Sequence, residues 1–442
     1  MTAVTAAPLR GNSLAKVVTT SLAASSIEWY DFFIYGTAAA LVFPKLFFAA
    51  SLPPAVAQIA AFSTFAVGFI ARPVGGVLFG HFGDRFGRKR ALVAALLIMG
   101  TATTLVGCLP SYATIGVAAP LALIVLRFAQ GLAVGGQWGG AALLAVESAP
   151  PGKRGYYGSF PQLGVPVGVI LANAIFLIMA ETLSPGSFQA WGWRVPFLLS
   201  LILVGLAIFV QLRLEDTPEF QALEVVEDRA AAQAKAVRSH NPIGDVIRKH
   251  PKEILLAAGS FVAPNGCFYI IITYSVAYAV AELHLPRPLV LKAVLLGALM
   301  TAVLTPIAGA LSDRFGRRGV FMFGAVFTGL WGLAFWPLMD MATFVPILIA
   351  ITGGLAAQTF MYAPQAALFA ELFSVEVRYS GASLGYQVGA IFGGGFAPII
   401  AGALLAETHN SMVIGAYMAV LCTISFLSVL MLAETHKREH RT

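Results

Sequence analysis

Hydrophobic positions along the chain gather into long runs that short polar stretches separate. Twelve of these runs reach about 20 residues, the length at which an α-helix crosses the hydrocarbon core of a bilayer. Six fall in each half, near 22–48, 55–80, 91–110, 114–146, 157–181 and 191–212, and near 254–281, 289–311, 319–339, 342–370, 379–406 and 411–433. The fourth and tenth exceed one span, so we expect a tilted or extra-membrane turn in each. The pattern predicts an all-α membrane protein of twelve transmembrane helices in two six-helix halves.

Charge is scarce in this chain and unevenly placed. Charged residues make up 11% of it, against roughly 25% in a soluble domain. If the N-terminus is cytoplasmic, the inner loops and the tails hold 22 of the 28 Lys and Arg. This bias predicts that both termini lie in the cytoplasm. The net charge of +7 then reports topology, and we expect a lipid bilayer and no nucleic acid as partner.

A repeated loop indicates that the two halves are duplicates. The sequence GHFGDRFGRK at 80–89 returns as GALSDRFGRR at 309–318, between two apolar runs in each case. A polar, Ala-rich stretch separates the halves. We therefore expect three parts, an N-terminal half, a cytoplasmic linker and a C-terminal half, over 1–213, 214–252 and 253–442.

The repeated loops are candidates for gates at the inner face. An Asp at this membrane edge pairs with a basic neighbour or caps a helix N-terminus across the seam between the halves, and such a contact exists in only one access state. A Glu and an Arg also follow the fourth and tenth runs with one shared spacing of seven. The alternative is a basic turn that only sets topology, with solvated loop charges beside it. The candidate gating residues are Asp84, Arg85, Arg88, Glu147, Arg154, Asp313, Arg314, Arg317, Glu371 and Arg378.

Charged residues within the predicted spans are the sharpest candidates for a site, because a charge in the bilayer costs several kcal/mol unless it is paired or hydrated. A carboxylate on one span that faces an arginine on another binds a proton and an organic anion, which is the coupling chemistry of a symporter. The alternative is a structural ion pair. Arg72 precedes Pro73 nearer the loop motif, so it is a structural residue or part of the site. The remaining candidates share helical faces of the first and fourth spans: Glu28, Asp31, Tyr35, Arg127, Gln130 and Gln137.

The C-terminal half offers uncharged candidates. Asn265 and Tyr269 follow Pro264 on the seventh span, where a broken helix frees backbone groups for a ligand. Gln358 and Tyr362 share one face of the tenth span. Each of these side chains serves equally well as a hydrogen bond between packed helices.

The sequence carries no sign of an enzyme. The three cysteines lie far apart in apolar runs and the seven histidines show no ligand spacing, so we expect no metal and no cofactor. Neither a Ser-His-Asp set nor an HExxH motif is visible. The first apolar run contains Glu28 and Asp31 and lacks a convincing cleavage site, so we expect it to remain as the first span.

Several stretches carry a resemblance to a known family. The repeated loops resemble the signature of the major facilitator superfamily, between spans two and three and between spans eight and nine. The segments EWYDFFIYGTAAALVF, GFIARPVGGVLFGHFGDRFGRKRAL, LRFAQGLAVGGQWGGAALLAVESAP and AELFSVEVRYSGASLGYQVG look like its metabolite:proton symporter group, and the shikimate-permease-like branch is most similar. The match covers almost the whole chain.

The resemblance implies a monomeric secondary transporter of the bacterial-type inner (plasma) membrane. It implies proton-coupled symport of a small organic acid, with Asp31 and Arg127 lining the central site. Symport of a zwitterionic osmolyte and antiport of a drug or metabolite are the alternatives. The chain departs from related permeases at Gln137, where they usually show Glu. We expect Glu28 and Asp31 to carry the proton instead, with Gln137 tuning the site. The alternative is that proton coupling is lost or changed in this chain.

Overall fold

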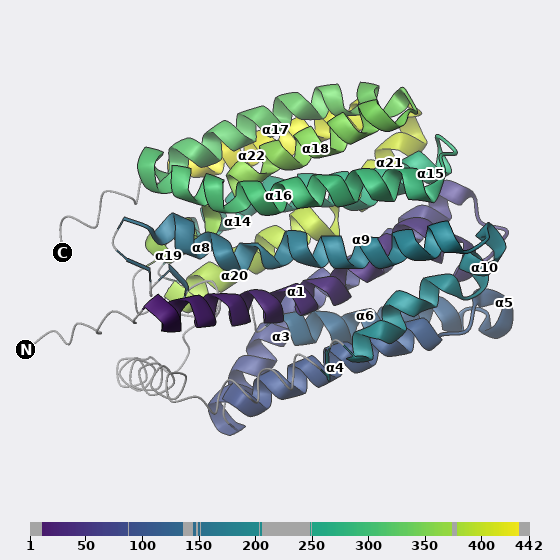
Figure 1. Cartoon of the computed structure of the whole chain (residues 1–442), viewed down its shortest axis with the longest axis horizontal. Coiled ribbons are helices and arrows are strands. Elements are labelled where there is room, and N and C mark those ends of the chain that lie inside the picture. The colour runs from purple at the N-terminus through teal and green to yellow at the C-terminus, as the bar shows by residue number, and fades with distance from the viewer. Residues whose placement is uncertain are drawn as a thin grey trace, which may run out of the picture.

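The computed structural model describes residues 11–86, 88–135, 145–146, 149–150, 152–202, 204–205, 248, 250–373 and 378–432. The long helices lie side by side along one axis (Figure 1). Each of the twelve predicted runs contains a helix or a broken helix. Among the described residues, eight helices are long and apolar enough to cross a membrane, and three apolar helices are shorter. The predicted all-α membrane fold is confirmed.

The first half of the chain builds its spans from single helices, except for the fifth span, which is broken at Leu163. The spans are α1 (Gly11–Leu41), α3 (Pro54–Phe86), α4 (Arg88–Cys108), α6 (Ala118–Val134), α8 (Arg154–Gln162) with α9 (Gly164–Thr182), and the apolar helix Gly192–Ile202. Short helices connect them: α2 (Phe43–Leu46), α5 (Tyr112–Ile115), α10 (Pro185–Ala190) and η1 (Gly192–Arg194).

The second half breaks three of its spans. The seventh is α14 (Pro251–Tyr269), the π-helix η2 (Ile270–Tyr274) and α15 (Ser275–Ala281). The tenth is α18 (Phe344–Tyr362) and α19 (Gln365–Leu372), and the eleventh is α20 (Arg378–Ala390), the π-helix η3 (Ile391–Gly395) and α21 (Ala397–Thr408). The unbroken spans are α16 (Arg287–Phe315), α17 (Arg317–Asp340) and α22 (Met412–Met431). The turn expected in the tenth run is the break between α18 and α19.

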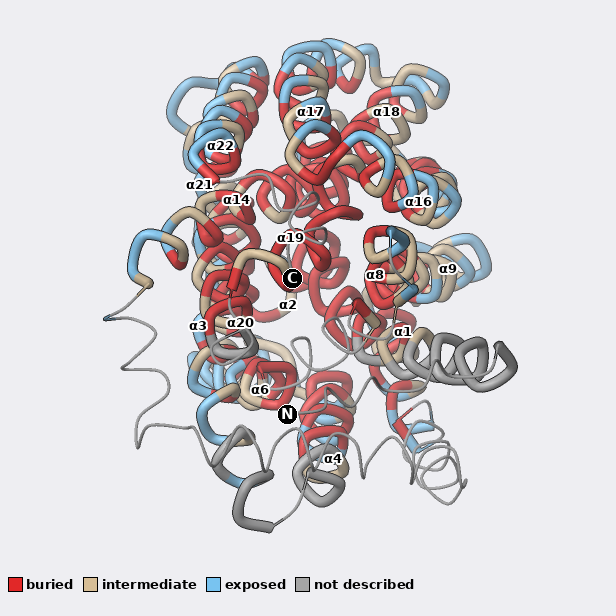
Figure 2. Tube along the Cα trace, turned by 90° about the vertical axis from the view of Figure 1, so that its left-hand side faces the viewer, coloured by how far each residue is buried: buried red, intermediate tan, exposed pale blue. Residues whose placement is uncertain are grey.

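Buried residues collect where the helices face one another, and exposed residues lie on the outside of the bundle (Figure 2). The outer surface is apolar, with Val125, Ile202 and Leu255 each more than 60% exposed. A bilayer would cover these side chains.

Small residues bring α3 and α6 into backbone contact. A Cβ atom built on Gly131 would lie 2.2 Å from the carbonyl oxygen of Gly68, and one on Gly135 would lie 1.9 Å from that of Arg72. Only glycine tolerates such an approach, which is typical of packed membrane helices. The contact holds the second and fourth spans together at the level of the two arginines within them.

Candidate substrate-binding site

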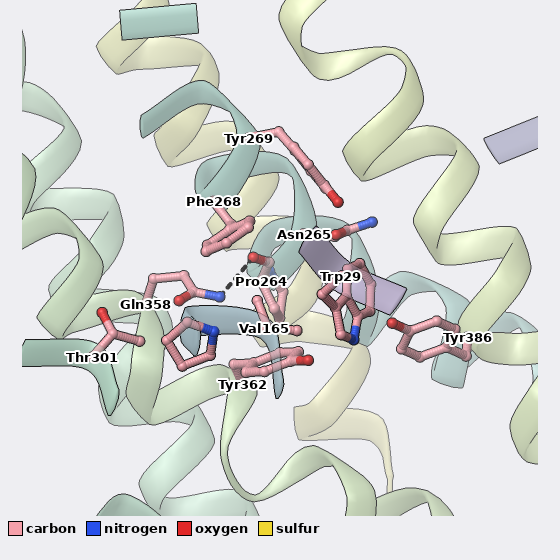
Figure 3. A pocket seen from close by; sticks show the side chains of 11 residues that line it. Trp29, Val165, Pro264, Asn265, Phe268, Tyr269, Thr301, Gln358, Tyr362 and Tyr386 are labelled. Atoms are coloured by element: carbon pink, nitrogen blue, oxygen red, sulfur yellow. Dashed lines mark hydrogen bonds between the residues drawn. The ribbon is translucent and has the colours of Figure 1, made fainter. Parts of the chain in front are cut away.

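A narrow cavity lies between the two halves of the chain (Figure 3). The predicted residues Asn265, Tyr269, Gln358 and Tyr362 all line it. The other lining residues are Trp29 from α1, Val165 and Pro166 from α9, and Pro264, Phe268, Thr301 and Tyr386 from the second half. Five aromatic rings and two amides therefore surround the space.

The broken seventh span positions the two amides. Pro264 has no backbone N–H, so it interrupts the hydrogen bonds of α14. Its carbonyl oxygen accepts a hydrogen bond of 2.8 Å from Gln358 Nε2 (Figure 3), and Asn265 Nδ2 donates to the carbonyl oxygen of Ala390 at 3.3 Å. The π-helix that follows is a feature often found at functional sites. The helix α14 thus continues through Pro264 to Tyr269, and the span departs from α-helical geometry only at the π-helix that follows.

Two buried guanidinium groups stand next to this cavity on the N-terminal side. Arg72 is 2% exposed and Arg127 is fully buried. Their Cζ atoms lie 4.4 Å and 4.0 Å from the ring centre of the same residue, Phe32, so they are no farther apart than the sum of these distances, 8.4 Å. Phe69 also stacks on Arg72, and Phe65 on Arg127. The aromatic faces stabilise both cations, by up to about 2 kcal/mol for each contact.

Among the residues that the structure describes, neither arginine forms an ion pair. Nε and Nη2 of Arg72 and Nη2 of Arg127 are buried without a hydrogen-bond partner. Removing a charge from water costs several kcal/mol, and unsatisfied N–H groups add to this cost. The two buried guanidinium groups thus keep donors that no described residue satisfies.

Asp31 is buried on the far side of a short hydrogen-bonded chain from Arg127. Arg127 Nη1 donates to Gln130 Oε1 at 3.2 Å, and Gln130 Nε2 donates to the Thr103 hydroxyl at 2.7 Å. Thr103 lies 3.4 Å from one Asp31 oxygen, and Ser200 donates to the other at 2.5 Å. Asp31 thus reaches Arg127 through two side chains rather than by direct contact. Tyr35 donates to Thr64 and stacks on Arg127.

Thr103 links the protonation of Asp31 to this chain. The Thr103 hydroxyl has one proton, which it donates either to the Met99 carbonyl oxygen at 2.8 Å or to the Asp31 carboxylate at 3.4 Å. A protonated Asp31 leaves that proton with Met99, whereas an ionised Asp31 competes for it. The arrangement is therefore sensitive to one proton.

At the inner end, Asp313 crosses the seam between the halves. Its two carboxylate oxygens accept hydrogen bonds from the backbone N–H groups of Gly155 and Tyr156, at 2.7 Å and 2.8 Å. These groups belong to the first turn of α8, so the carboxylate caps the helix and complements its dipole. Arg317 pairs with Asp313 at 2.6 Å and with Glu371 at 3.1 Å. This is the cap across the seam that the repeated loop predicts.

The contact at this end leaves no room for a larger side chain. A Cβ atom on Gly155 would lie 2.3 Å from the Ser312 hydroxyl oxygen and 2.5 Å from the carbonyl oxygen of Gly309. Arg314 is exposed and stacks on Phe315, and among the described residues it makes no contact with the cap. Arg154 begins α8 beside these residues.

The outer end has a second connection between the same two spans, which the sequence analysis missed. Lys292 of α16 pairs with Glu181 of α9 at 2.5 Å, and Arg287 donates to Gln189 at 3.1 Å. The Lys292 and Glu181 side chains are nearly half exposed, so the pair contributes less than about 1 kcal/mol. Contacts thus join the halves both above and below the cavity.

Some predicted residues cannot be placed. Gln137 and Glu147 lie outside the described residues, as do the side chains of Glu28, Asp84, Arg85, Arg88 and Arg378. The aromatic residues around the arginines were missed, although Trp29 and Phe32 stand in the segment EWYDFF. An aromatic residue in a span is usually a packing residue, so only its position over a buried cation distinguishes it.

A bundle of membrane helices in two halves, with a cavity between them and contacts at both ends, has the architecture of a secondary transporter. The family model described as sugar (and other) transporter matches residues 16–441. The chain therefore belongs to this family of the major facilitator superfamily, and the predicted resemblance is confirmed. It is a multi-pass membrane transporter and not an enzyme.

Individual relatives agree with the family assignment. The chain is 42% identical to the inner membrane metabolite transport protein YhjE of Escherichia coli K12, over 98% of this chain and 96% of the relative. It is 39% identical to the shikimate transporter of the same organism, over 94% of each. The xylose transporter XylE of Escherichia coli, in a partially occluded inward-open conformation, superposes with a TM-score of 0.73 at 17% identity, over 96% of this chain and 99% of that one. This last likeness concerns the fold alone.

Proposed function

We propose that the chain takes up a small organic acid together with a proton across the inner membrane of a bacterium. The observation that carries the proposal is the pair of buried guanidinium groups without an ion-pair partner among the described residues. An anionic substrate would supply the missing charge. Transport of shikimate by a relative that is 39% identical supports a carboxylate as the substrate.

Asp31 is the proposed proton carrier. It is fully buried, accepts from Ser200, and connects to Arg127 through Thr103 and Gln130. Binding of a proton would release Thr103 from the carboxylate and alter the hydrogen bonds that hold Gln130 and Arg127. The state of Asp31 would thereby reach the anion site without direct contact. Gln137 would tune the site rather than carry a proton.

The amides and rings of the second half form the proposed remainder of the substrate site. Asn265, Gln358, Tyr269 and Tyr362 would bind the hydroxyl groups and the body of the substrate. Access would alternate as the cap of Asp313 on α8 and the outer pair of Glu181 and Lys292 open in turn. The equivalent loop at Asp84 would act in the same way in the first half.

We also propose the division of the chain that the sequence predicts, with one six-helix half over residues 1–213 and the other over residues 253–442. The linker over 214–252 would lie in the cytoplasm with both termini, and the unit would be a monomer.

A zwitterionic osmolyte is the second candidate substrate. The five rings that line the cavity suit a quaternary ammonium group, and the arginines suit the carboxylate of the same molecule. The proline/betaine transporter of Escherichia coli K12 is 31% identical to the chain.

Thermal unfolding of the purified protein separates these candidates, because a ligand that binds the folded state raises its apparent stability. Shikimate, citrate, glycine betaine and proline would each be added at a concentration of several millimolar. We expect a carboxylic acid to raise the unfolding temperature most. Stabilisation by glycine betaine or proline alone would favour the osmolyte, and a protein that none of them stabilises would contradict the proposed function.

A further inference from the structure

The free donors of Arg72 form a specific shape. Its unpartnered atoms are Nε and Nη2. The protons on these two nitrogens point to the same side of the planar guanidinium, so they form the edge that grips a carboxylate through two parallel hydrogen bonds. Both nitrogens of this edge lack a hydrogen-bond partner, and the Arg72 residue is 2% exposed.

Arg127 does not offer the same edge. Its Nη1 donates to Gln130 Oε1 at 3.2 Å, and its Nε donates to the carbonyl oxygen of Phe65 at 3.5 Å. Only Nη2 is left without a partner. A carboxylate could take the Nε and Nη2 edge of Arg127 only if Nε gave up its hydrogen bond to Phe65. The two arginines are therefore unequal as anchors, although they stack on the same ring of Phe32.

Arg72 is also joined to the cavity wall. Its Cζ atom lies 5.4 Å from the ring centre of Trp29. The guanidinium group of Arg72 also lies within hydrogen-bonding reach of the Tyr269 hydroxyl. Trp29 and Tyr269 both line the cavity, on opposite sides of Asn265 (Figure 3). Arg127 contacts Tyr35, Phe32 and Phe65, and none of these lines the cavity.

We propose that Arg72 binds the carboxylate of the substrate through its Nε and Nη2 edge, while Arg127 belongs to the coupling chain that ends at Asp31. This inference rests on the proposed function and assigns its two cations to separate tasks. The ligand class is a small carboxylic acid whose body stacks on Trp29 and Tyr269. Its hydrogen-bonding groups, at the end away from the carboxylate, reach Asn265 and Gln358.

A purely structural Arg72 is the competing explanation, in which the aromatic stack and the Tyr269 hydroxyl hold the cation. That explanation leaves two buried N–H donors without a partner, and an unsatisfied buried donor destabilises the folded protein. A bound carboxylate satisfies both donors at once. The side chain of Glu28 lies outside the described residues, so the experiment includes a variant at that position.

The test compares two matched substitutions, Arg72→Lys and Arg127→Lys, with the wild type. The probe is whichever of shikimate and citrate stabilises the wild type more, and the same acid with every carboxyl group converted to its methyl ester is the uncharged counterpart. Dissociation constants for acid and ester come from thermal-shift titration. We expect Arg72→Lys to weaken binding of the acid roughly 10- to 100-fold, because a bidentate fork becomes a point charge. Binding of the ester should change less than about threefold, and Arg127→Lys should weaken binding of the acid less than Arg72→Lys does.

Arg72→Met provides a second test that does not depend on a lysine in the same place. Methionine has a volume similar to that of arginine and carries no charge. The ligand-free variant should therefore unfold at the same temperature as the wild type or higher, while its preference for the acid is lost. A lower unfolding temperature with the preference retained would show that Arg72 is structural. Acid binding that survives in Arg72→Lys but fails in Arg127→Lys would overturn the assignment. Loss of the preference in Glu28→Gln with none in Arg72→Lys would overturn it too.

Different results would contradict the proposed function and the assignment of Arg72. If neither acid stabilises the wild type, the organic-acid substrate is wrong, and the inference is wrong with it. If an acid binds and Arg72→Lys has no effect on its affinity, only the inference is wrong.

Discussion

The two sides of the cavity differ in chemistry although the halves carry the same loop motif. On the N-terminal side, Asp31, Arg72 and Arg127 are all buried within spans. On the C-terminal side, the lining consists of amides, hydroxyls and rings, and the charged residues of the described spans lie near their ends, as Lys292 and Asp313 do. Under the proposed function, the first half binds the proton and the charge of the substrate, and the second half recognises the uncharged part of the substrate.

The comparison has a physical reason. Burial of a charged side chain inside the bilayer costs free energy. A transporter therefore needs charged side chains on only one side of the cavity. The other side then recognises the substrate with neutral groups, whose burial costs less when they are hydrogen-bonded, as Gln358 is to Pro264. Substitution of Asp31 on one side and of Gln358 on the other should therefore separate proton coupling from recognition of the uncharged part of the substrate.

The largest effect is expected from Asp31→Asn. An amide cannot carry a proton, so accumulation driven by a pH gradient should vanish while exchange of labelled for unlabelled substrate continues. The measurement is uptake and counterflow in proteoliposomes. Glu407→Gln, at an exposed position, serves as control. If Asp31→Asn and Glu28→Gln both accumulate substrate fully, the proton site does not lie on the first span.

A smaller effect on a different quantity is expected from Gln358→Leu, on the other side of the cavity. Leucine is similar in size to glutamine but forms no hydrogen bond. The affinity for the substrate should therefore fall by about 10-fold, equivalent to about 1.4 kcal/mol. Proton-driven accumulation at saturating substrate should persist. Loss of coupling with affinity intact would show that the division between the halves is wrong.

The inner cap should give a still smaller effect. Asp313→Asn keeps the shape but removes the charge that complements α8 and pairs with Arg317. We expect transport to slow by several-fold, in line with about 1 kcal/mol for a helix cap, while substrate affinity from the outer side is spared. Arg314→Gln, at the exposed neighbouring position, should be silent. Equal losses of binding and turnover in Asp313→Asn would argue against a gate, and Asp84→Asn extends the test to the first half.

Much of this architecture could be predicted from the sequence. Runs of apolar residues report spans because a bilayer demands them, and a repeated Asp at the membrane edge predicts the helix cap that Asp313 forms. The chain from Arg127 through Gln130 and Thr103 to Asp31 could not be predicted in full. It depends on which faces of three helices meet, and Thr103 and Ser200 look like ordinary small polar residues of packed spans.

The smallest effect concerns the position at which the chain departs from related permeases. Gln137→Glu adds a group that titrates, so the pH optimum of uptake should shift while the maximal accumulation ratio changes little. The pH profile of uptake in proteoliposomes measures this. Coupling that appears only in Gln137→Glu would mean that the wild-type chain lacks its own proton carrier.

The most direct measurement of the central claim follows protons and substrate together. Proteoliposomes that contain a trapped pH indicator receive shikimate or citrate on the outside, without any imposed gradient. If the substrate enters with protons, the interior should acidify as it accumulates, and an inside-alkaline gradient should drive its accumulation above the external concentration. Asp31→Asn should abolish both signals. Substrate entry with no change of internal pH, and with equal concentrations on the two sides at the end, would contradict proton-coupled uptake.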